Sequence, residues 1–168
     1  MKKSYPYNLL LIGSALWCFL LFIPPLLTSN LFPSHSLSRV FYSGFSKICH
    51  QDDIRSFHFL GQKLAVCIRC SSIYVGFFAG VVVFGLVRKA EVLKFHPWFI
   101  VSMLPMLIDV AFDLFGIHSS NDVTRCLTGS VFGLLAGIVL VPSFEEALSQ
   151  FLSPQQFIEG VGHESQTG

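Results

Sequence analysis

Four stretches of the chain are almost continuously apolar, and most of the charged residues lie between them. The stretches cover residues 8–27, 68–87, 97–116 and 126–141, and each is close to the roughly 20 residues that a helix needs to cross a bilayer. They do not alternate between apolar and polar positions as barrel strands do, and a spanning helix satisfies its own backbone hydrogen bonds. The pattern therefore predicts an all-α integral membrane protein with four transmembrane helices.

Composition supports this class. Hydrophobic residues make up 52% and charged residues 12% of the 168 residues, and the mean hydropathy is +0.63. Such a chain has more apolar surface than a small soluble core can bury, so the lipid bilayer is the partner that the composition predicts. The formal net charge of +1 provides no basic field, and nucleic-acid binding is not expected.

The loop of residues 28–66, between the first two apolar stretches, is too long for a simple connection and predicts a folded cap. A hairpin is expected over residues 56–66, turning at Leu60-Gly61-Gln62-Lys63. A short interfacial helix behind Ser36 is expected because apolar and aromatic residues recur there at helical spacing. These residues are Leu37, Val40, Phe41, Gly44, Phe45 and Ile48.

We expect one membrane domain over residues 1–142 that includes this cap. Residues 143–168 are expected to form a short helix, with Ser143 and Glu146 at capping-box spacing, and then a disordered polar tail. The first apolar stretch is long and lacks a cleavage site of the A-x-A kind, so we interpret it as a retained anchor and not as a signal peptide.

The distribution of basic residues predicts the orientation. The amino terminus and the second loop carry Lys2, Lys3, Arg88, Lys89 and Lys94, whereas the opposite side carries Arg39, Lys47, Arg55 and Lys63. The positive-inside rule then places both termini in the cytoplasm of a multi-pass cell-membrane protein. The cap would face outward, where free thiols oxidise unless a metal ion or a disulfide occupies them.

Three cysteines mark a candidate site at the end of the cap. Cys49 is followed by His50, and Cys67-Ile68-Arg69-Cys70 opens the second apolar stretch. Three thiolates with His50, or with His58 as a substitute, would form a tetrahedral metal site, for which zinc is the favoured ion. A structural disulfide, redox chemistry and inert thiols are the alternatives.

The redox alternative is a membrane thiol-disulfide oxidoreductase coupled to a quinone. The Cys67-x-x-Cys70 pair lies at a helix start beside Arg69, a setting that lowers a thiol pKa. Such a relay needs a second cysteine pair, which only Cys49 with Cys126 could supply. Cys18 is interpreted as a small buried apolar residue.

A second candidate cluster lies inside the membrane. Asp109 and Asp113 are four residues apart and share one face of the third predicted helix, where two like charges need a cation or a proton. Arg69 and Arg125 are expected at the same level, so ion pairing is one interpretation. A proton relay or a carboxylate metal site is the other.

Five short motifs occur between residues 39 and 137, each at one place. They are Cys49-His50-Gln51, Arg55-Ser56-Phe57, Cys67-x-Arg69-Cys70-x-x-Ile73-Tyr74-x-Gly76, Pro105-x-x-x-Asp109, and Ser120-Asn121 with Arg125-x-x-Thr128-Gly129. Their combination resembles the predicted membrane proteins grouped as domain of unknown function 2085. The chain departs from that pattern at Ser71-Ser72, where a threonine followed by a glycine is expected, and at Asp113, where a glutamine is expected.

The resemblance implies a membrane protein with the cysteine site and a nearby polar cluster, but it supplies no reaction. The polar cluster consists of Arg55, Arg69, Tyr74, Asp109, Asp113, Asn121 and Arg125. The sequence contains no H-E-x-x-H zinc-protease motif, C-x-x-C-H haem motif or glycine-rich phosphate loop. Whether the chain is an enzyme is therefore left open.

Overall fold

The computed structural model describes residues 5–29, 34–53, 55–87, 96–115 and 121–152; the side chains of residues 96–99, 102, 113 and 152 are not part of this description. Several predictions made from the sequence fall outside it. They concern Lys2 and Lys3, the basic second loop at residues 88–95, Ser120, and the polar tail from residue 153 onward.

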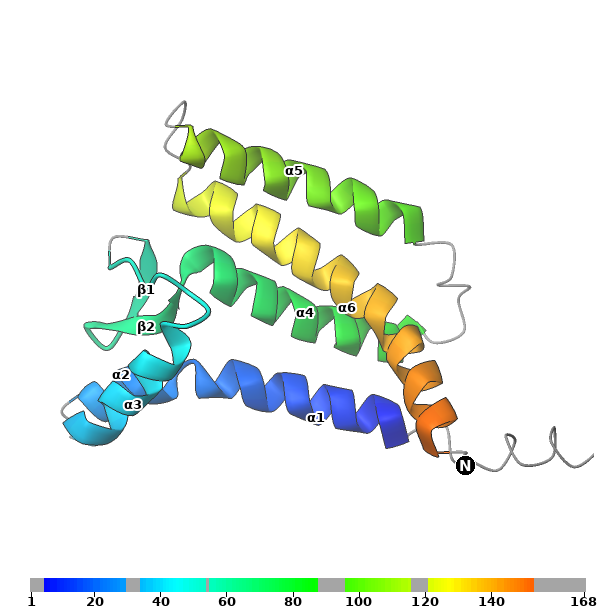
Figure 1. Cartoon of the computed structure of the whole chain (residues 1–168), viewed down its shortest axis with the longest axis horizontal. Helices are drawn as coiled ribbons and strands as arrows, with labels where there is room; N and C mark the ends of the chain where they lie inside the picture. Colours follow the sequence, from blue (N-terminus) through cyan, green and yellow to red (C-terminus); the bar gives the residue numbers. More distant parts are fainter. Residues whose placement is uncertain (1–4, 30–33, 54, 88–95, 116–120, 153–168) are drawn as a thin grey trace, which may run out of the picture.

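Four long helices lie side by side in the order α1, α4, α6 and α5, and the cap lies beyond the ends of the helices, where α1 finishes and α4 begins (Figure 1). The cap consists of α2, α3 and a hairpin of β1 and β2, and it connects α1 to α4. The elements are α1 (Tyr5–Leu20), α2 (Ile23–Thr28), α3 (His35–Phe45), β1 (Ser56–Phe59), β2 (Gln62–Cys67), α4 (Ile68–Val87), α5 (His96–Leu114) and α6 (Asp122–Leu152).

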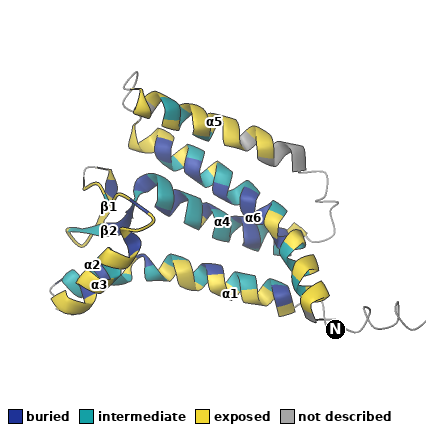
Figure 2. Cartoon of the chain, viewed as in Figure 1, coloured by how far each residue is buried: buried dark blue, intermediate teal, exposed yellow. Residues whose placement is uncertain are grey.

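Three segments of the described chain are long and apolar enough to cross a membrane: Tyr5–Thr28, Ile68–Val87 and Asp122–Phe151. The third of the four predicted spans forms α5, whose described apolar part runs from Met103 to Phe112. A fourth crossing therefore stays a prediction. The two outer helices of the row, α1 and α5, carry many exposed residues (Figure 2), and many of these are large hydrophobic side chains. Exposed apolar surface of this extent fits contact with lipid.

Glycines allow α4 and α6 to pack with their backbones in contact. A Cβ atom on Gly133 of α6 would meet the carbonyl oxygen of Ile73, and one on Gly76 of α4 would meet that of Ser130. Gly80 and Gly137 face the opposite helix in the same way. Small residues at such spacing are how membrane helices approach closely, because a larger side chain would hold the backbones apart.

The cap contains a small antiparallel sheet beside its helices, so the all-α description applies to the long helices and not to the whole chain. In this sheet β1 and β2 are antiparallel, with Ser56 opposite Cys67 and Phe59 opposite Gln62. The turn is formed by Leu60 and Gly61, both with positive φ, as a two-residue hairpin requires. The hairpin predicted from the sequence is thus present.

The last helix differs from the prediction. Residues after Val141 were expected to form a separate helix capped by Ser143 and Glu146, whereas α6 runs without interruption from Asp122 to Leu152. Pro142 lies inside it, and α6 changes direction in its C-terminal part (Figure 1). Proline removes one backbone donor and kinks a helix without having to end it, so capping-box spacing alone does not create a boundary.

Candidate metal centre

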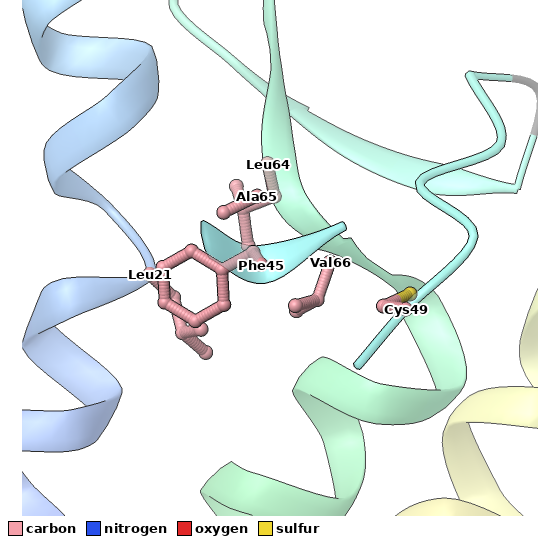
Figure 3. Close-up of a cluster of buried hydrophobic side chains, with 6 residues drawn as sticks. All are labelled: Leu21, Phe45, Cys49, Leu64, Ala65 and Val66. Carbon is pink, nitrogen blue, oxygen red and sulfur yellow. The ribbon is translucent and has the colours of Figure 1, made fainter. Parts of the chain in front are cut away.

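The end of α3 and its following turn place Cys49. The Cys49 N–H donates to the Phe45 carbonyl at 3.0 Å, so the turn continues the path of the helix. Phe45 and Cys49 are buried against Leu21 of the α1–α2 junction and against β2 (Figure 3). This apolar cluster also contains Leu64, Ala65 and Val66, and Figure 3 shows Cys49 at its edge, beside the start of α4.

The junction of β2 and α4 places the other two cysteines. Cys67 is the last residue of β2 and Cys70 lies in the first turn of α4. The Ile68 N–H, at the start of the helix, donates to the Arg55 carbonyl at 2.9 Å. The strand passes directly into the helix, and the two sulfur atoms of the C-x-x-C motif lie within 4.8 Å of each other.

The three cysteines meet at one point. Their Sγ atoms all lie within 4.8 Å of one another, and the Cys67 N–H donates to Cys49 Sγ at 3.2 Å. Tetrahedral zinc with Zn–S bonds of about 2.3 Å holds its sulfurs about 3.8 Å apart, so the cluster is within about 1 Å of that geometry. All five cysteines of the chain are free thiols in the structure.

The environment of Cys49 favours its thiolate. Hydrogen bonds from the Cys67 and Cys70 thiols hold the pKa of Cys49 well below its ordinary value, and the backbone N–H groups of Gln51 and Cys67 act in the same direction. Burial acts against them by raising the pKa, but its effect is smaller than that of the thiol donors. The thiolate is the form of cysteine that binds a metal.

The loop after Cys49 is fixed by Gln51, a role that the sequence analysis did not assign. Gln51 has a φ of 52°, in the left-handed region that few residues other than glycine adopt. Its side-chain amide donates to the Tyr42 carbonyl at 2.7 Å, and its own carbonyl accepts from Lys63 Nζ at 3.3 Å. The loop is thereby clamped between α3 and β2. Only membership in the Cys49-His50-Gln51 motif marks this residue in the sequence.

A pocket of about 410 Å³ opens beside the cysteine cluster. Besides the three cysteines, it is lined by His50, Asp52 and three arginines, Arg55, Arg69 and Arg125. The arginines come from the loop before β1, the start of α4 and the start of α6. The structure therefore joins the cysteine motifs to part of the predicted polar cluster.

The predicted pairing of an arginine with an aspartate is present between Arg69 and Asp109. Arg69 Nη2 lies 2.5 Å from Asp109 Oδ2, and the two side chains are 17% and 11% exposed. This pair ties α4 to α5. Arg125 is buried in the first turn of α6. The side chain of Asp113 is outside the described part of the chain, so its predicted role is not tested.

The two histidines occupy different places. His50 is exposed and lines the pocket of the cysteine cluster, although it is not within the group of three close sulfurs. His58 lies in β1, with Nε2 3.6 Å from Asp53 Oδ1, and it lines a separate pocket. Cys126 lines this second pocket as well.

Tyr74 and Asn121 are the remaining predicted site residues. The ring of Tyr74 packs edge-on against Trp17 with centroids 5.8 Å apart, and its carbonyl accepts a hydrogen bond from Cys18. Asn121 is exposed at the start of α6, where its carbonyl accepts from the Arg125 N–H at 3.1 Å. Neither residue lines the pocket of the cysteine cluster.

Comparison with known proteins confirms the resemblance drawn from the motifs. Residues 49–139, more than half of the chain, match the family described as predicted membrane protein (DUF2085). An uncharacterised protein of Methanocaldococcus jannaschii is 32% identical over 155 residues, which cover 88% of this chain and 97% of the relative. An uncharacterised protein of Methanothermobacter thermautotrophicus is 32% identical over 90 residues, which cover 54% of this chain and 81% of the relative. No solved structure matches the chain. The chain belongs to the DUF2085 family of predicted membrane proteins.

Proposed function

We propose that this protein is a metal-holding membrane protein in which Cys49, Cys67 and Cys70 bind one ion, zinc being favoured, at the interface between the cap and the membrane domain. The observation that carries the proposal is the approach of all three Sγ atoms to within 4.8 Å of one another. Cys49 reaches that point from the turn after α3, and the Cys67/Cys70 pair reaches it from the junction of β2 and α4. Thiolate-rich sets of this kind select zinc and other thiophilic ions over magnesium or calcium.

A metal accounts for the cluster better than a disulfide does. A disulfide joins two sulfurs and leaves the third thiol beside it, whereas a tetrahedral ion uses all three. The depressed pKa of Cys49 supplies a thiolate at neutral pH, which a structural disulfide does not need. The three cysteines then act as one site.

His50 is our choice for the fourth ligand, because it follows Cys49 directly and lines the same pocket. His58 is disfavoured as a substitute, since it pairs with Asp53 and lines a different pocket. With His50 bound, the site is closed and structural; with water in that position, it is open to a small ligand from the pocket.

The physical effect of the metal is to fasten the cap to the second span. Cys49 belongs to the turn after α3, and Cys70 belongs to α4, so an ion shared between them links two elements that the sequence separates by a hairpin. The proposed location is the cell membrane, with both termini cytoplasmic and the cap outside. The positive-inside bias of the basic residues supports this orientation.

Elemental analysis of detergent-purified protein, prepared without chelator, tests the proposal. We expect about one zinc ion per chain, and loss of that zinc in Cys67→Ser. The matched control is Cys126→Ser, which removes a thiol that lies outside the group of three and should leave the metal in place. Protein that carries no metal and contains oxidised cysteines would overturn the proposal.

A quinone-coupled oxidoreductase is the competing function. It needs Cys49 and Cys126 to act as a second pair, but Cys126 lines a pocket other than the one beside Cys49. The same preparation distinguishes the two functions, because a relay predicts an exchangeable disulfide that is lost in Cys126→Ser. The separation of these two cysteines is the reason that we favour the metal.

A further inference from the structure

Three arginines converge on the pocket of the cysteine cluster from separate parts of the chain. Arg55 approaches from the loop before β1, Arg69 from the second position of α4, and Arg125 from the first turn of α6. Among the described residues that line the pocket, Asp52 supplies the carboxylate. The described lining thus brings three guanidinium groups and one carboxylate next to the three thiols.

The arginine charges are permanent, and those of Arg69 and Arg125 are largely removed from water. A guanidinium group does not lose its proton in proteins, so a buried arginine keeps its charge and needs compensation. Arg125 is 6% exposed. Asp52 pairs with Arg55 at 3.3 Å and Asp109 pairs with Arg69 from outside the pocket. Arg69 Nε is also buried, with no hydrogen-bond partner among the described atoms.

The pocket has room for more than a metal ion. Its volume of about 410 Å³ lies within the range of roughly 300–1,000 Å³ that is usual for small-molecule sites. Arg55, with a side chain 48% exposed, lies where water can reach the pocket. A guanidinium group presents its N–H donors as a planar fork, which matches the two oxygens of a carboxylate or of a phosphate group.

We propose that this pocket binds a small oxyanion, the carboxylate or phosphate group of its ligand, on Arg55, Arg69 and Arg125 beside the cysteine cluster. The ligand belongs to the class of small anionic metabolites or of anionic lipid headgroups, which share this chemistry. The position beside a metal rests on the proposed function, whereas the oxyanion contacts rest on the arginines alone. The anion would occupy the space between the thiols and the start of α6.

A different use of the arginines has to be separated from this one. A zinc ion with three thiolates has a net charge of −1, and the guanidinium groups would then serve only to neutralise it. In that case the arginine variants would lose zinc, and the protein would not bind an added anion. Zinc content and anion binding must therefore be measured on the same preparations.

Inorganic phosphate is the probe for the soluble ligand. Zinc-loaded protein and reduced, chelator-treated protein are placed in uncharged detergent without phosphate buffer, and line broadening of the phosphorus NMR signal is followed as phosphate is added. We expect saturable binding that weakens roughly tenfold to a hundredfold in Arg125→Gln, because a charge-assisted hydrogen bond is lost. Arg55→Gln should weaken phosphate binding as well. Because the Arg55 side chain is half exposed, this variant should fold, and it tests the site even if Arg125→Gln does not fold.

Arg39→Gln is the matched control, since Arg39 is exposed on α3 and hydrogen-bonds within its own helix, at the His35 carbonyl. This variant should bind phosphate as the wild type does. For the lipid source, protein in bilayer nanodiscs of phosphatidylcholine and phosphatidylglycerol is examined by native mass spectrometry. Phosphatidylglycerol that stays bound to the wild type and is lost in Arg125→Gln assigns the oxyanion to a lipid headgroup; saturation by free phosphate without retained lipid assigns it to a soluble anion.

The outcomes separate this inference from the proposed function. Saturable phosphate or lipid binding that depends on Arg55 and Arg125 supports the anion site, even in protein that holds no zinc. One zinc per chain with neither phosphate nor phosphatidylglycerol bound would overturn the anion site and leave the metal site intact. Equal weakening in Arg39→Gln would also overturn it, because binding would then reflect general surface charge.

Discussion

The close approach of α4 and α6 predicts that an added methyl group at Gly133 destabilises the protein, whereas the same change at Gly13 does not. A Cβ atom on Gly133 would meet the Ile73 carbonyl oxygen, and it would lie 2.9 Å from both Ile73 C and Phe77 N. The latter two distances are about 0.5 Å below ordinary contact, which begins at 3.4 Å. All of these atoms belong to helix backbone and cannot rotate away.

The magnitude follows from two opposing effects. Alanine is favoured over glycine in a helix by about 0.8–1.0 kcal/mol, a gain that applies equally at Gly13 and at Gly133. Overpacking of a well-packed contact costs about 1–3 kcal/mol, and backbone obstruction puts Gly133→Ala near the upper end. A Cβ atom on Gly13 meets nothing within 4 Å. We therefore expect Gly133→Ala to be about 3 kcal/mol less stable than Gly13→Ala.

Equilibrium unfolding in mixed micelles, with sodium dodecyl sulfate as the denaturant and helix content as the signal, measures this difference. Gly13→Ala should unfold at the same or a slightly higher fraction of the denaturing detergent than the wild type. Gly133→Ala should unfold at a clearly lower fraction. A difference below about 1 kcal/mol between the two variants would refute the backbone contact of α4 and α6, since the cost of overpacking would then be absent.

Three further predictions concern the site. Asp109→Asn should destabilise the protein by about 3–5 kcal/mol in the same unfolding assay, because it leaves the Arg69 charge buried without its carboxylate. Asp122→Asn, at an exposed position, is the control. An equal effect of the two variants would contradict the ion pair of Arg69 with Asp109. In reduced, metal-free protein, the lowered pKa of Cys49 should make stability rise with pH through the neutral range, by up to about 1.4 kcal/mol per pH unit, because the unfolded thiol binds a proton that the folded one has lost. The contribution of Cys49 is complete above the pKa of the unfolded thiol and is lost as the pH falls toward the pKa of the folded thiol. If Cys49→Ser had the same dependence of stability on pH as the wild type, this prediction would be contradicted. His50→Ala should keep about one zinc per chain but lower the affinity roughly tenfold to a hundredfold, as a competition titration with a chelator would show; an unchanged affinity would exclude His50 as a ligand.

The sequence was most informative where one physical requirement dominates. The second span was predicted at residues 68–87 and forms α4 over Ile68–Val87, because the length of an apolar run is dictated by the bilayer and charged residues close it. The approach of Cys49 to Cys67 and Cys70 was also predicted, since a short helix before Cys49 and a hairpin after it leave the chain little freedom. The hairpin followed from its turn residues.

Other features depend on packing that no local pattern encodes. Gln51 adopts a left-handed conformation because Tyr42 and Lys63 hold its amide and carbonyl, and these contacts come from α3 and β2. The continuation of α6 past Val141 could not be derived from Ser143 and Glu146, which fit a helix interior as well as a cap. Convergence of Arg55 with the other arginines became visible only once the cap was placed against the helices.

X-ray absorption spectroscopy at the zinc edge tests the central claim most directly, because it reports the atoms bound to the ion. On protein purified without chelator, we predict three sulfur neighbours per zinc at about 2.3 Å, with a single nitrogen or oxygen neighbour at about 2.0–2.1 Å completing the set. These sulfurs would be Cys49, Cys67 and Cys70, the three whose Sγ atoms the fold gathers within 4.8 Å. A first shell made only of nitrogen and oxygen would contradict the account, because the ion would then be bound away from the cysteine cluster.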